Sequence, residues 1–141
     1  MRFCSAAALS MVALLSAGVA RAETVHFTAT LTGGDEVPAN ATAGKGTFTA
    51  ELETMENTLT YRAAYTGLTG PATMAHVHGP ANPGANAPPV VMVPDAAHIS
   101  GAVQLTAAQA EALKAGKLYF NVHTAANPGG EIRGQIKRDL P

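Results

Sequence analysis

The fold is decided by residues 45–66, which read KGTFTAELETMENTLTYRAAYT. Apolar side chains occupy alternate positions in both halves of this stretch: Phe48, Ala50 and Leu52, and then Leu59, Tyr61, Ala63 and Tyr65. A period of two places these side chains on one face of a β-strand and the polar ones on the other. The polar segment 55–57 separates the two halves. The stretch therefore predicts a β-hairpin with one buried face.

The same alternation continues on both sides of this hairpin. Further strands are predicted at residues 23–31, 73–78, 89–93, 98–105, 117–124 and 131–137. Thr106 can cap a short helix over residues 107–115, and Gly116 stands where a left-handed C-terminal cap is expected. Many short strands with a single helix are typical of an all-β fold. We expect one domain, an antiparallel β-sandwich or small barrel with one short helix near residues 106–115.

The first residues have the features of a secretory signal peptide. Arg2 supplies the positive start, residues 6–15 form a short apolar run, and Ala20-Arg21-Ala22 has the small-x-small form of a cleavage site. The apolar run is shorter than the roughly 20 residues that a spanning helix needs. The sequence therefore predicts a signal peptide at residues 1–22 and an exported domain at 23–141, in the periplasm or outside the cell.

Charge and composition narrow the function of this exported domain. Removal of Arg2, Arg21 and Cys4 with the signal leaves seven basic residues against ten acidic ones, and no cysteine for a disulfide. This balance argues against binding to nucleic acid or to an anionic membrane surface. Ser100 is the only serine that remains, and the carboxylates are scattered singly. The composition therefore favours a protein that is not an enzyme.

Three histidines are the most informative polar residues of the sequence. In the strand predicted at residues 73–78, alternation places Met74, His76 and His78 on one face and the small apolar residues on the other. In the strand predicted at 117–124, His123 likewise lies opposite the apolar face. Three imidazoles then point away from the core. Because imidazole is the commonest ligand of transition metals in proteins, we expect a metal site here.

The predicted site requires that the two strands be neighbours in the sheet. Nitrogens that bind one ion must lie within roughly 4 Å of each other, because each bond is near 2 Å long. Three neutral nitrogens with an open position suit Cu(II), with Zn(II) as the alternative, and the Met74 thioether would favour Cu(I). The alternative interpretation is that His76, His78 and His123 are ordinary residues of a solvated sheet face.

The other two histidines are expected to lie outside this site. His26 falls on the polar face of the first predicted strand, where a solvated side chain is typical. His98 follows Asp95 by three residues and would approach the site only if its loop folded back. We predict that neither histidine is a ligand.

A carboxylate and a guanidinium stand out in a chain that is poor in charge. Glu36 and Arg133 are predicted to form a partly buried ion pair that tethers the corner at residues 36–38 to the last strand. Gly134 is expected to permit close packing of that strand.

Four motifs occur in an order that resembles the CHRD domain family: LTGGDEVP at residues 31–38, AHVHG at 75–79, YFNVHT at 119–124 and NPGGEIRGQI at 127–136. The family is named after chordin and is widespread as a single exported bacterial domain. The resemblance covers nearly the whole of the predicted mature chain. It implies an all-β sandwich, and in chordin the domain belongs to an extracellular protein that binds growth factors.

A weaker likeness connects the chain to copper-zinc superoxide dismutase. His76, His78, His123 and Arg133 follow the order of that family's His-x-His copper ligands, its late histidine and its arginine. The likeness implies a Greek-key sandwich of the immunoglobulin-like or dismutase-like type. It also implies an alternative role for Arg133, which would guide anions above the metal. The chain lacks the dismutase cysteine pair, and its bridging histidine and zinc cluster have no match here. Dismutase-like activity is therefore the third hypothesis.

A non-catalytic interaction module is the second hypothesis. Residues 79–88 form a loop rich in Gly, Pro and Asn that begins directly after His78. This loop and the polar sheet face would contact a protein or a polysaccharide, and the histidines would be incidental. Under either leading hypothesis we expect a monomer or a weak oligomer.

Overall fold

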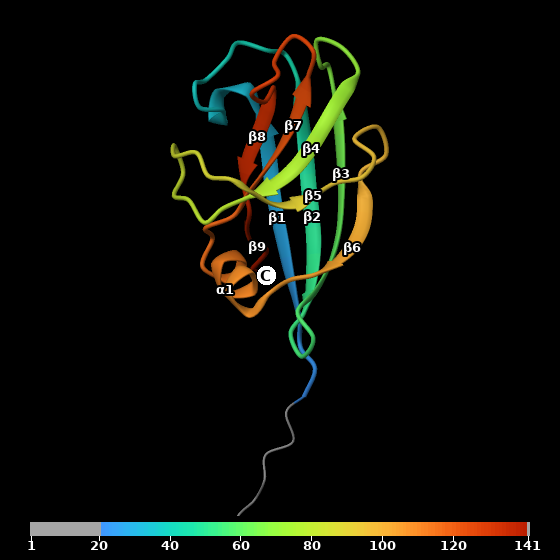
Figure 1. Ribbon diagram of the computed structural model, residues 1–141, viewed down its shortest axis with the longest axis vertical. Helices are drawn as coiled ribbons and strands as arrows, with labels where there is room; N and C mark the ends of the chain where they lie inside the picture. The colour runs from blue at the N-terminus through green and yellow to red at the C-terminus, as the bar shows by residue number, and fades with distance from the viewer. Residues whose placement is uncertain (1–20, 141) are drawn as a thin grey trace, which may run out of the picture.

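Alternating apolar and polar residues form nine β-strands in the computed structural model, which describes residues 21–140 (Figure 1). In chain order the elements are β1 (Thr24–Thr32), the 3-10 turn η1 (Gly33–Asp35), β2 (Lys45–Glu53), β3 (Thr58–Thr66), β4 (Ala72–His78), β5 (Pro89–Met92), β6 (Ser100–Gln104), α1 (Ala107–Lys114), β7 (Tyr119–Thr124), β8 (Ile132–Gln135) and β9 (Lys137–Arg138). The predicted signal peptide at residues 1–22 lies almost entirely outside the described residues. Each strand predicted from the sequence has a counterpart in this order.

The strands form one continuous antiparallel sheet. Its order is β5-β4-β7-β8-β1-β2-β3-β6, and β9 pairs with β1 beside this path. The predicted hairpin is confirmed, because β2 and β3 pair over their whole length from Lys45↔Thr66 to Glu53↔Thr58. The sheet bends around β1, so that β4, β7 and β8 lie across from β1, β2 and β3 (Figure 1). This arrangement confirms the predicted all-β sandwich.

The hydrophobic core fills the space between the two layers. The ring of Phe48, from β2, stacks on the ring of Phe120, from β7, with centroids 4.6 Å apart. Around this contact lie buried side chains from both layers: Phe27, Leu31, Leu52, Leu59, Val77, Val122 and Ile132. Burying a side chain of this size contributes about 1.5 to 3 kcal/mol relative to leaving it exposed. The core is therefore the main source of stability for a domain that has no disulfide.

The helix begins and ends where its capping residues predict. The Thr106 side chain accepts a hydrogen bond from the Gln109 backbone N–H, and the Gln109 side chain accepts one from the Thr106 N–H. This reciprocal capping box satisfies two backbone donors at the start of α1. Gly116 adopts φ +69°, the left-handed conformation that ends a helix. Within residues 21–140 no helix is long and apolar enough to cross a membrane.

The last long strand approaches its neighbour closely at a glycine. Gly134 in β8 is buried, and a Cβ atom added there would lie 2.9 Å from the carbonyl carbon of Thr30 in β1. Only a residue without a side chain allows the two strands to meet at this distance. The sequence prediction of close packing at Gly134 is therefore confirmed.

A buried carboxylate joins four segments at one end of the sandwich. Glu131 is fully buried, and its oxygens accept hydrogen bonds from the hydroxyls of Thr42, Thr69 and Thr124 at 2.5 to 2.6 Å. The Thr69 backbone N–H and the Asn127 amide donate further bonds at 2.8 and 3.2 Å. The donors come from the loop before β2, the loop between β3 and β4, the end of β7 and the loop that follows β7. The carboxylate thus fixes the loops around the end of β7.

These donors set the acidity of Glu131. Burial alone raises the pKa of a carboxyl group, but the hydrogen bonds from Thr124, Thr42 and Thr69 outweigh burial and lower the pKa of Glu131 to about 2. A carboxyl whose folded pKa is depressed stabilises the fold above its unfolded pKa, near 4.5. That stabilisation is lost as the pH falls from there toward 2.

We expect Glu131→Gln to lower the free energy of unfolding by about 3 kcal/mol at pH 7, because the amide loses the charge and turns an N–H group toward donors. Urea unfolding at pH 7 and pH 3 measures the effect, and the difference from wild type should shrink at pH 3. Glu56→Gln, at an exposed turn residue, serves as the control and should change little. Equal stability of the Glu131→Gln protein at pH 7 would contradict this account.

Candidate metal centre

Two strands that are distant in the sequence carry the three histidines. β4 pairs with β7 in antiparallel register, with Met74 opposite His123, His76 opposite Asn121 and His78 opposite Tyr119. Directly opposite residues share a face of the sheet, and so do residues two apart along a strand. The register therefore places all three imidazoles on the same face. The adjacency that the sequence interpretation required is present.

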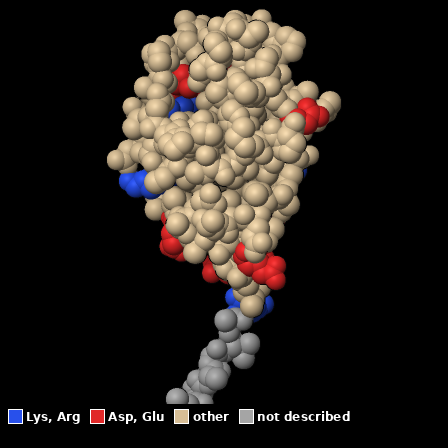
Figure 2. Space-filling view, in the orientation of Figure 1, with Lys and Arg blue, Asp and Glu red and all other residues tan. Residues whose placement is uncertain are grey.

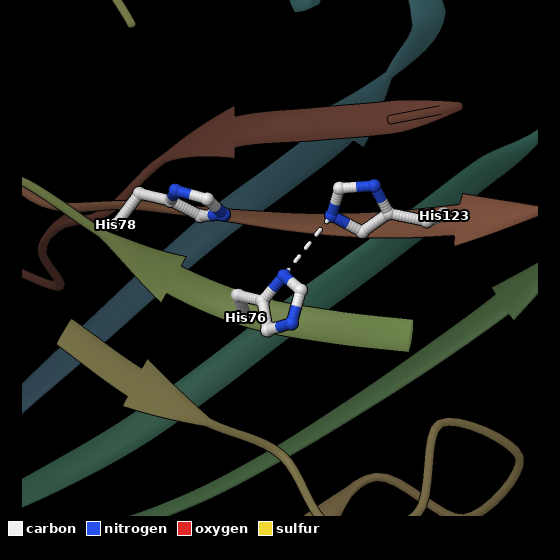
Figure 3. A group of neighbouring side chains, drawn as sticks. All are labelled: His76, His78 and His123. Carbon is white, nitrogen blue, oxygen red and sulfur yellow. Dashed lines mark hydrogen bonds between the residues drawn. The ribbon is translucent and has the colours of Figure 1, made fainter. Parts of the chain in front are cut away.

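The three rings converge on one another (Figure 3). Nδ1 of His76 lies 3.1 Å from Nε2 of His123. One nitrogen from each ring can be chosen so that all three lie within 4.8 Å of one another. Two nitrogens bound to one ion are at most about 4 Å apart, so the ligand atoms must approach by about 1 Å. The rings must therefore rotate slightly for all three nitrogens to bind one ion.

The histidines lie on the face opposite the core, as predicted, but this face is not open to solvent. His76 is 7% exposed and His123 is 6% exposed, while His78 is half-buried. The loops at residues 79–88 and 125–130 fold back and contact the rings. The alternative interpretation, in which these histidines lie on a solvated sheet face, is therefore wrong, because loops without periodicity cover that face.

Backbone carbonyls fix the tautomers of two rings. Nδ1 of His78 lies 2.8 Å from the carbonyl oxygen of Ala87, and Nδ1 of His123 lies 2.9 Å from that of Pro128. A carbonyl only accepts, so each Nδ1 carries the proton and donates it. In the neutral rings the lone pair is then on Nε2. This is the usual way in which a protein orients imidazole for a metal.

The lone pair of His78 accepts no hydrogen bond from residues 21–140. Its Nε2 atom is buried and makes no hydrogen bond within residues 21–140, one of only two such buried side-chain atoms there. Burying an unsatisfied polar atom costs about 1 to 3 kcal/mol. Figure 3 shows one nitrogen of His78 directed toward the other two rings. The fold therefore presents an unpaired imidazole donor inside the cluster.

The remaining contact joins the other two rings. Because Nε2 of His123 carries the lone pair, Nδ1–H of His76 donates to it across the 3.1 Å separation. The Asn121 carboxamide also lies at this nitrogen, with its side-chain oxygen placed 3.0 Å away. A carboxamide that turns its NH2 group to the same position donates instead, and that orientation suits the lone pair.

The surroundings keep two of these rings neutral. Burial lowers the pKa of His76, and the neighbouring His123 and His78 lower it further. Burial also lowers the pKa of His78, and the neighbouring His123 and Arg133 lower it further, although the Ala87 carbonyl and the Asn121 side chain oppose this effect. A lowered pKa means that the ring stays unprotonated at neutral pH. Neutral imidazole is the form that binds a metal.

Arg133 is placed differently from the sequence prediction. Its guanidinium lies over the Tyr119 ring, 3.4 Å from the centroid, and donates to the Ala85 carbonyl at 2.6 Å and the Asn86 side-chain oxygen at 3.0 Å. The ion pairs of the described chain do not include one between Arg133 and Glu36. The predicted ion pair is therefore wrong, because the loop at 79–88 supplies nearer acceptors.

The corner at residues 36–38 is tethered to Arg133 in β8, but through Asn86 and not through an ion pair with Glu36. Asn86 accepts from Arg133 and donates through its own amide to the Val37 carbonyl at 3.0 Å. Glu36 is buried beside Gly130, and its Oε1 has no hydrogen-bond partner among the described residues. Burial raises the pKa of Glu36 to about 7, although Arg133 lowers it in part. Near neutral pH this carboxyl is therefore protonated far more readily than an ordinary glutamate.

Two further histidines lie outside the cluster, as expected. His26 faces Glu51 at 3.6 Å, and His98 faces Asp95 at 3.2 Å, both on exposed surfaces. Met74, the predicted soft donor, lies opposite His123 and is 45% exposed. The sequence interpretation missed Tyr119, whose ring stacks on His78 with centroids 4.9 Å apart. Its position two residues before Asn121 on the polar face of the strand was the available signal.

Comparison with known proteins gives one family. The family model of the CHRD domain matches residues 27–136, which is most of the chain and includes all three histidines. No curated protein and no solved structure matches the chain. The activity must therefore be inferred from the geometry of this site.

We expect Arg133→Lys to loosen the loop at residues 79–88, because an ammonium lacks the planar fork and the stacking surface of guanidinium. Amide hydrogen exchange at Ala87, whose N–H donates to the Tyr119 hydroxyl, should become about tenfold faster. Arg62→Lys, on the exposed face of β3, is the matched control. Unchanged exchange at Ala87 would show that Arg133 does not hold the loop.

Proposed function

The chain belongs to the CHRD domain family, and from this premise we propose that it is an exported, non-catalytic domain that binds a single copper ion through His76, His78 and His123. The protein would serve in copper storage, copper delivery or protection outside the cytoplasm. The family match accounts for the fold. The metal site is inferred from the histidines of this chain.

One observation carries the proposal: the buried and unpaired Nε2 of His78. Its ring cannot turn away without losing the bond to Ala87 and the stacking on Tyr119. Protonation offers no relief, because burial lowers the pKa of this ring. A metal ion bound by this nitrogen and by the nearby nitrogens of His76 and His123 satisfies the lone pair.

The chemistry of the donors favours copper. Three neutral imidazoles bind Cu(II) with higher affinity than Zn(II). Copper also accepts a site in which three nitrogens bind and one coordination position stays open. Met74 adds a thioether on the same face, opposite His123, as a candidate fourth ligand. Thioether ligands select copper rather than zinc. Zinc is therefore the alternative metal in this proposal.

The three residues of the cluster are uncharged when their imidazoles are neutral. Charged side chains are few on the face drawn in Figure 2, and they are scattered. The histidine cluster itself contains no carboxylate. Affinity must therefore come from direct bonds to nitrogen, so that removal of one ligand has a large effect.

We expect purified protein to bind one Cu(II) ion, and His76→Ala, His78→Ala or His123→Ala to weaken binding by about 100-fold or more, because each removes one of three ligands. Isothermal titration calorimetry measures the affinity, and electron paramagnetic resonance should show nitrogen hyperfine structure that changes in each variant.

His26→Ala and His98→Ala are the matched controls, since both remove an exposed imidazole outside the cluster. They should bind as the wild type does. If His123→Ala binds Cu(II) as tightly as the wild type, the assignment fails and the interaction module becomes the leading function.

Copper affinity should also depend on pH. Protonated imidazole cannot bind a metal, and the pKa values of His76 and His78 lie below the ordinary 6.5. Apparent affinity should therefore stay nearly constant from pH 8 to about 6.5 and decline below that range. Titrations at half-unit steps from pH 8 to 5 test this. Affinity that does not change down to pH 5 would exclude histidine ligands.

A further inference from the structure

Two exposed methionines lie on β4 and β5, beside the three-histidine cluster. The described residues contain three methionines, and all are exposed: Met55 at 60%, Met74 at 45% and Met92 at 62%. Met55 lies in the turn between β2 and β3, far along the chain from the histidines. Met74 and Met92 instead lie on the two strands that form this edge of the sheet. Large apolar side chains seldom remain exposed as neighbours without a reason.

The register of the sheet places both thioethers on the histidine face. Met92 in β5 is directly opposite His76 in β4, and Met74 precedes His76 by two residues on the same strand. Val91 precedes Met92 in β5, points to the opposite face of the sheet and is buried in the core. Opposite residues of an antiparallel pair have Cα atoms about 4.5 to 5.5 Å apart. His76 therefore has one methionine along its strand and another across from it.

The tautomer of His76 leaves a donor free on its outer side. Its Nδ1 carries the proton that is donated to His123, so the lone pair of the neutral ring is on Nε2. Nε2 of His76 makes no hydrogen bond within residues 21–140. Figure 3 shows this second nitrogen on the side of the ring turned away from His78 and His123. The His76 ring therefore directs Nδ1 toward the other two histidines and Nε2 toward its outer side.

We propose that Met74, Met92 and Nε2 of His76 form a Cu(I) site at the edge of the sheet, distinct from the three-histidine site. Two thioethers and one imidazole form a soft donor set with three members, which suits Cu(I) and its analogue Ag(I). The proposal deepens the proposed copper function and rests on it through His76. It assigns a role to Met92, which the three-histidine site does not use.

The two sites use opposite nitrogens of one ring. Binding at the inner site requires the lone pair of His76 on Nδ1, whereas binding at the edge requires it on Nε2. Movement of one proton between the ring nitrogens therefore changes which site is complete. The hydrogen bond from His76 to His123 fixes the tautomer that the edge site needs. Without metal, the protein is therefore prepared for Cu(I) at the edge.

The test compares Cu(I) and Cu(II) in the same variants. The purified protein competes with a chromogenic chelator for Cu(I) under anaerobic conditions, and Cu(II) is titrated separately. We expect Met74→Leu/Met92→Leu to weaken Cu(I) binding by about tenfold or more, since leucine keeps apolar volume but has no sulfur. Cu(II) affinity should stay within about twofold of wild type in the single variant Met92→Leu, which retains Met74, the candidate fourth ligand of the three-histidine site. Met55→Leu is the matched control and should change neither.

Nuclear magnetic resonance with Ag(I) gives an independent measurement. The ε-methyl signals of Met74 and Met92 should shift on addition of Ag(I), and that of Met55 should not. Unchanged Cu(I) affinity in the double variant, or unshifted methyl signals, would overturn the edge site. The proposed function is judged separately, because it depends on loss of Cu(II) binding in His123→Ala, a variant that retains both methionines.

Discussion

Burial of β7 on both of its faces is the constraint on which the site depends. Every residue from Tyr119 to Thr124 is buried. On one face, Phe120 and Val122 join the apolar core. The opposite face carries polar side chains, and each buried polar group needs a partner. The loops that cover this face supply backbone carbonyls, and these carbonyls orient His78 and His123. The requirement to satisfy a buried polar face thus produces an ordered array of imidazoles.

The same requirement explains why long irregular loops are fixed in this protein. Glu131 collects hydroxyl and amide donors from several loops, and Arg133 collects carbonyl and side-chain acceptors from the loop at 79–88. One buried anion and one buried cation, two residues apart, therefore hold different loops. Ionic groups are stabilising in the interior only when their hydrogen-bonding capacity is filled. Here the loop backbone fills it, and the ions do not pair with each other.

Sequence reasoning predicted local structure well, since local structure follows from local pattern. Alternation in residues 45–66 gave the hairpin, and Thr106 with Gly116 gave the helix ends. The predicted metal site required β4 to pair with β7, but the sequence could not predict this pairing. Contacts between distant segments leave no periodic signal. The cover over His76 and His123 was missed for a related reason, since residues 79–88 carry turn chemistry and no indication of the surface on which they fold. Met92 was overlooked in the apolar run 89–93, where alternation is hidden.

Within residues 21–140 the two buried side-chain atoms without a hydrogen bond, Oε1 of Glu36 and Nε2 of His78, are relieved in different ways, and the difference supports the proposed metal site. Protonation can neutralise Glu36 near neutral pH, because burial raises its pKa to about 7. The neutral carboxyl then bears an O–H donor of its own, and the cost of its burial falls. His78 has no such route, since its ring is already neutral and burial opposes a charge. Its lone pair can be satisfied by a hydrogen-bond donor or by an electron-pair acceptor, and in the proposed function that acceptor is the metal. A copper ion is such an acceptor, and the positive charge it brings would favour ionisation of Glu36 through simple attraction.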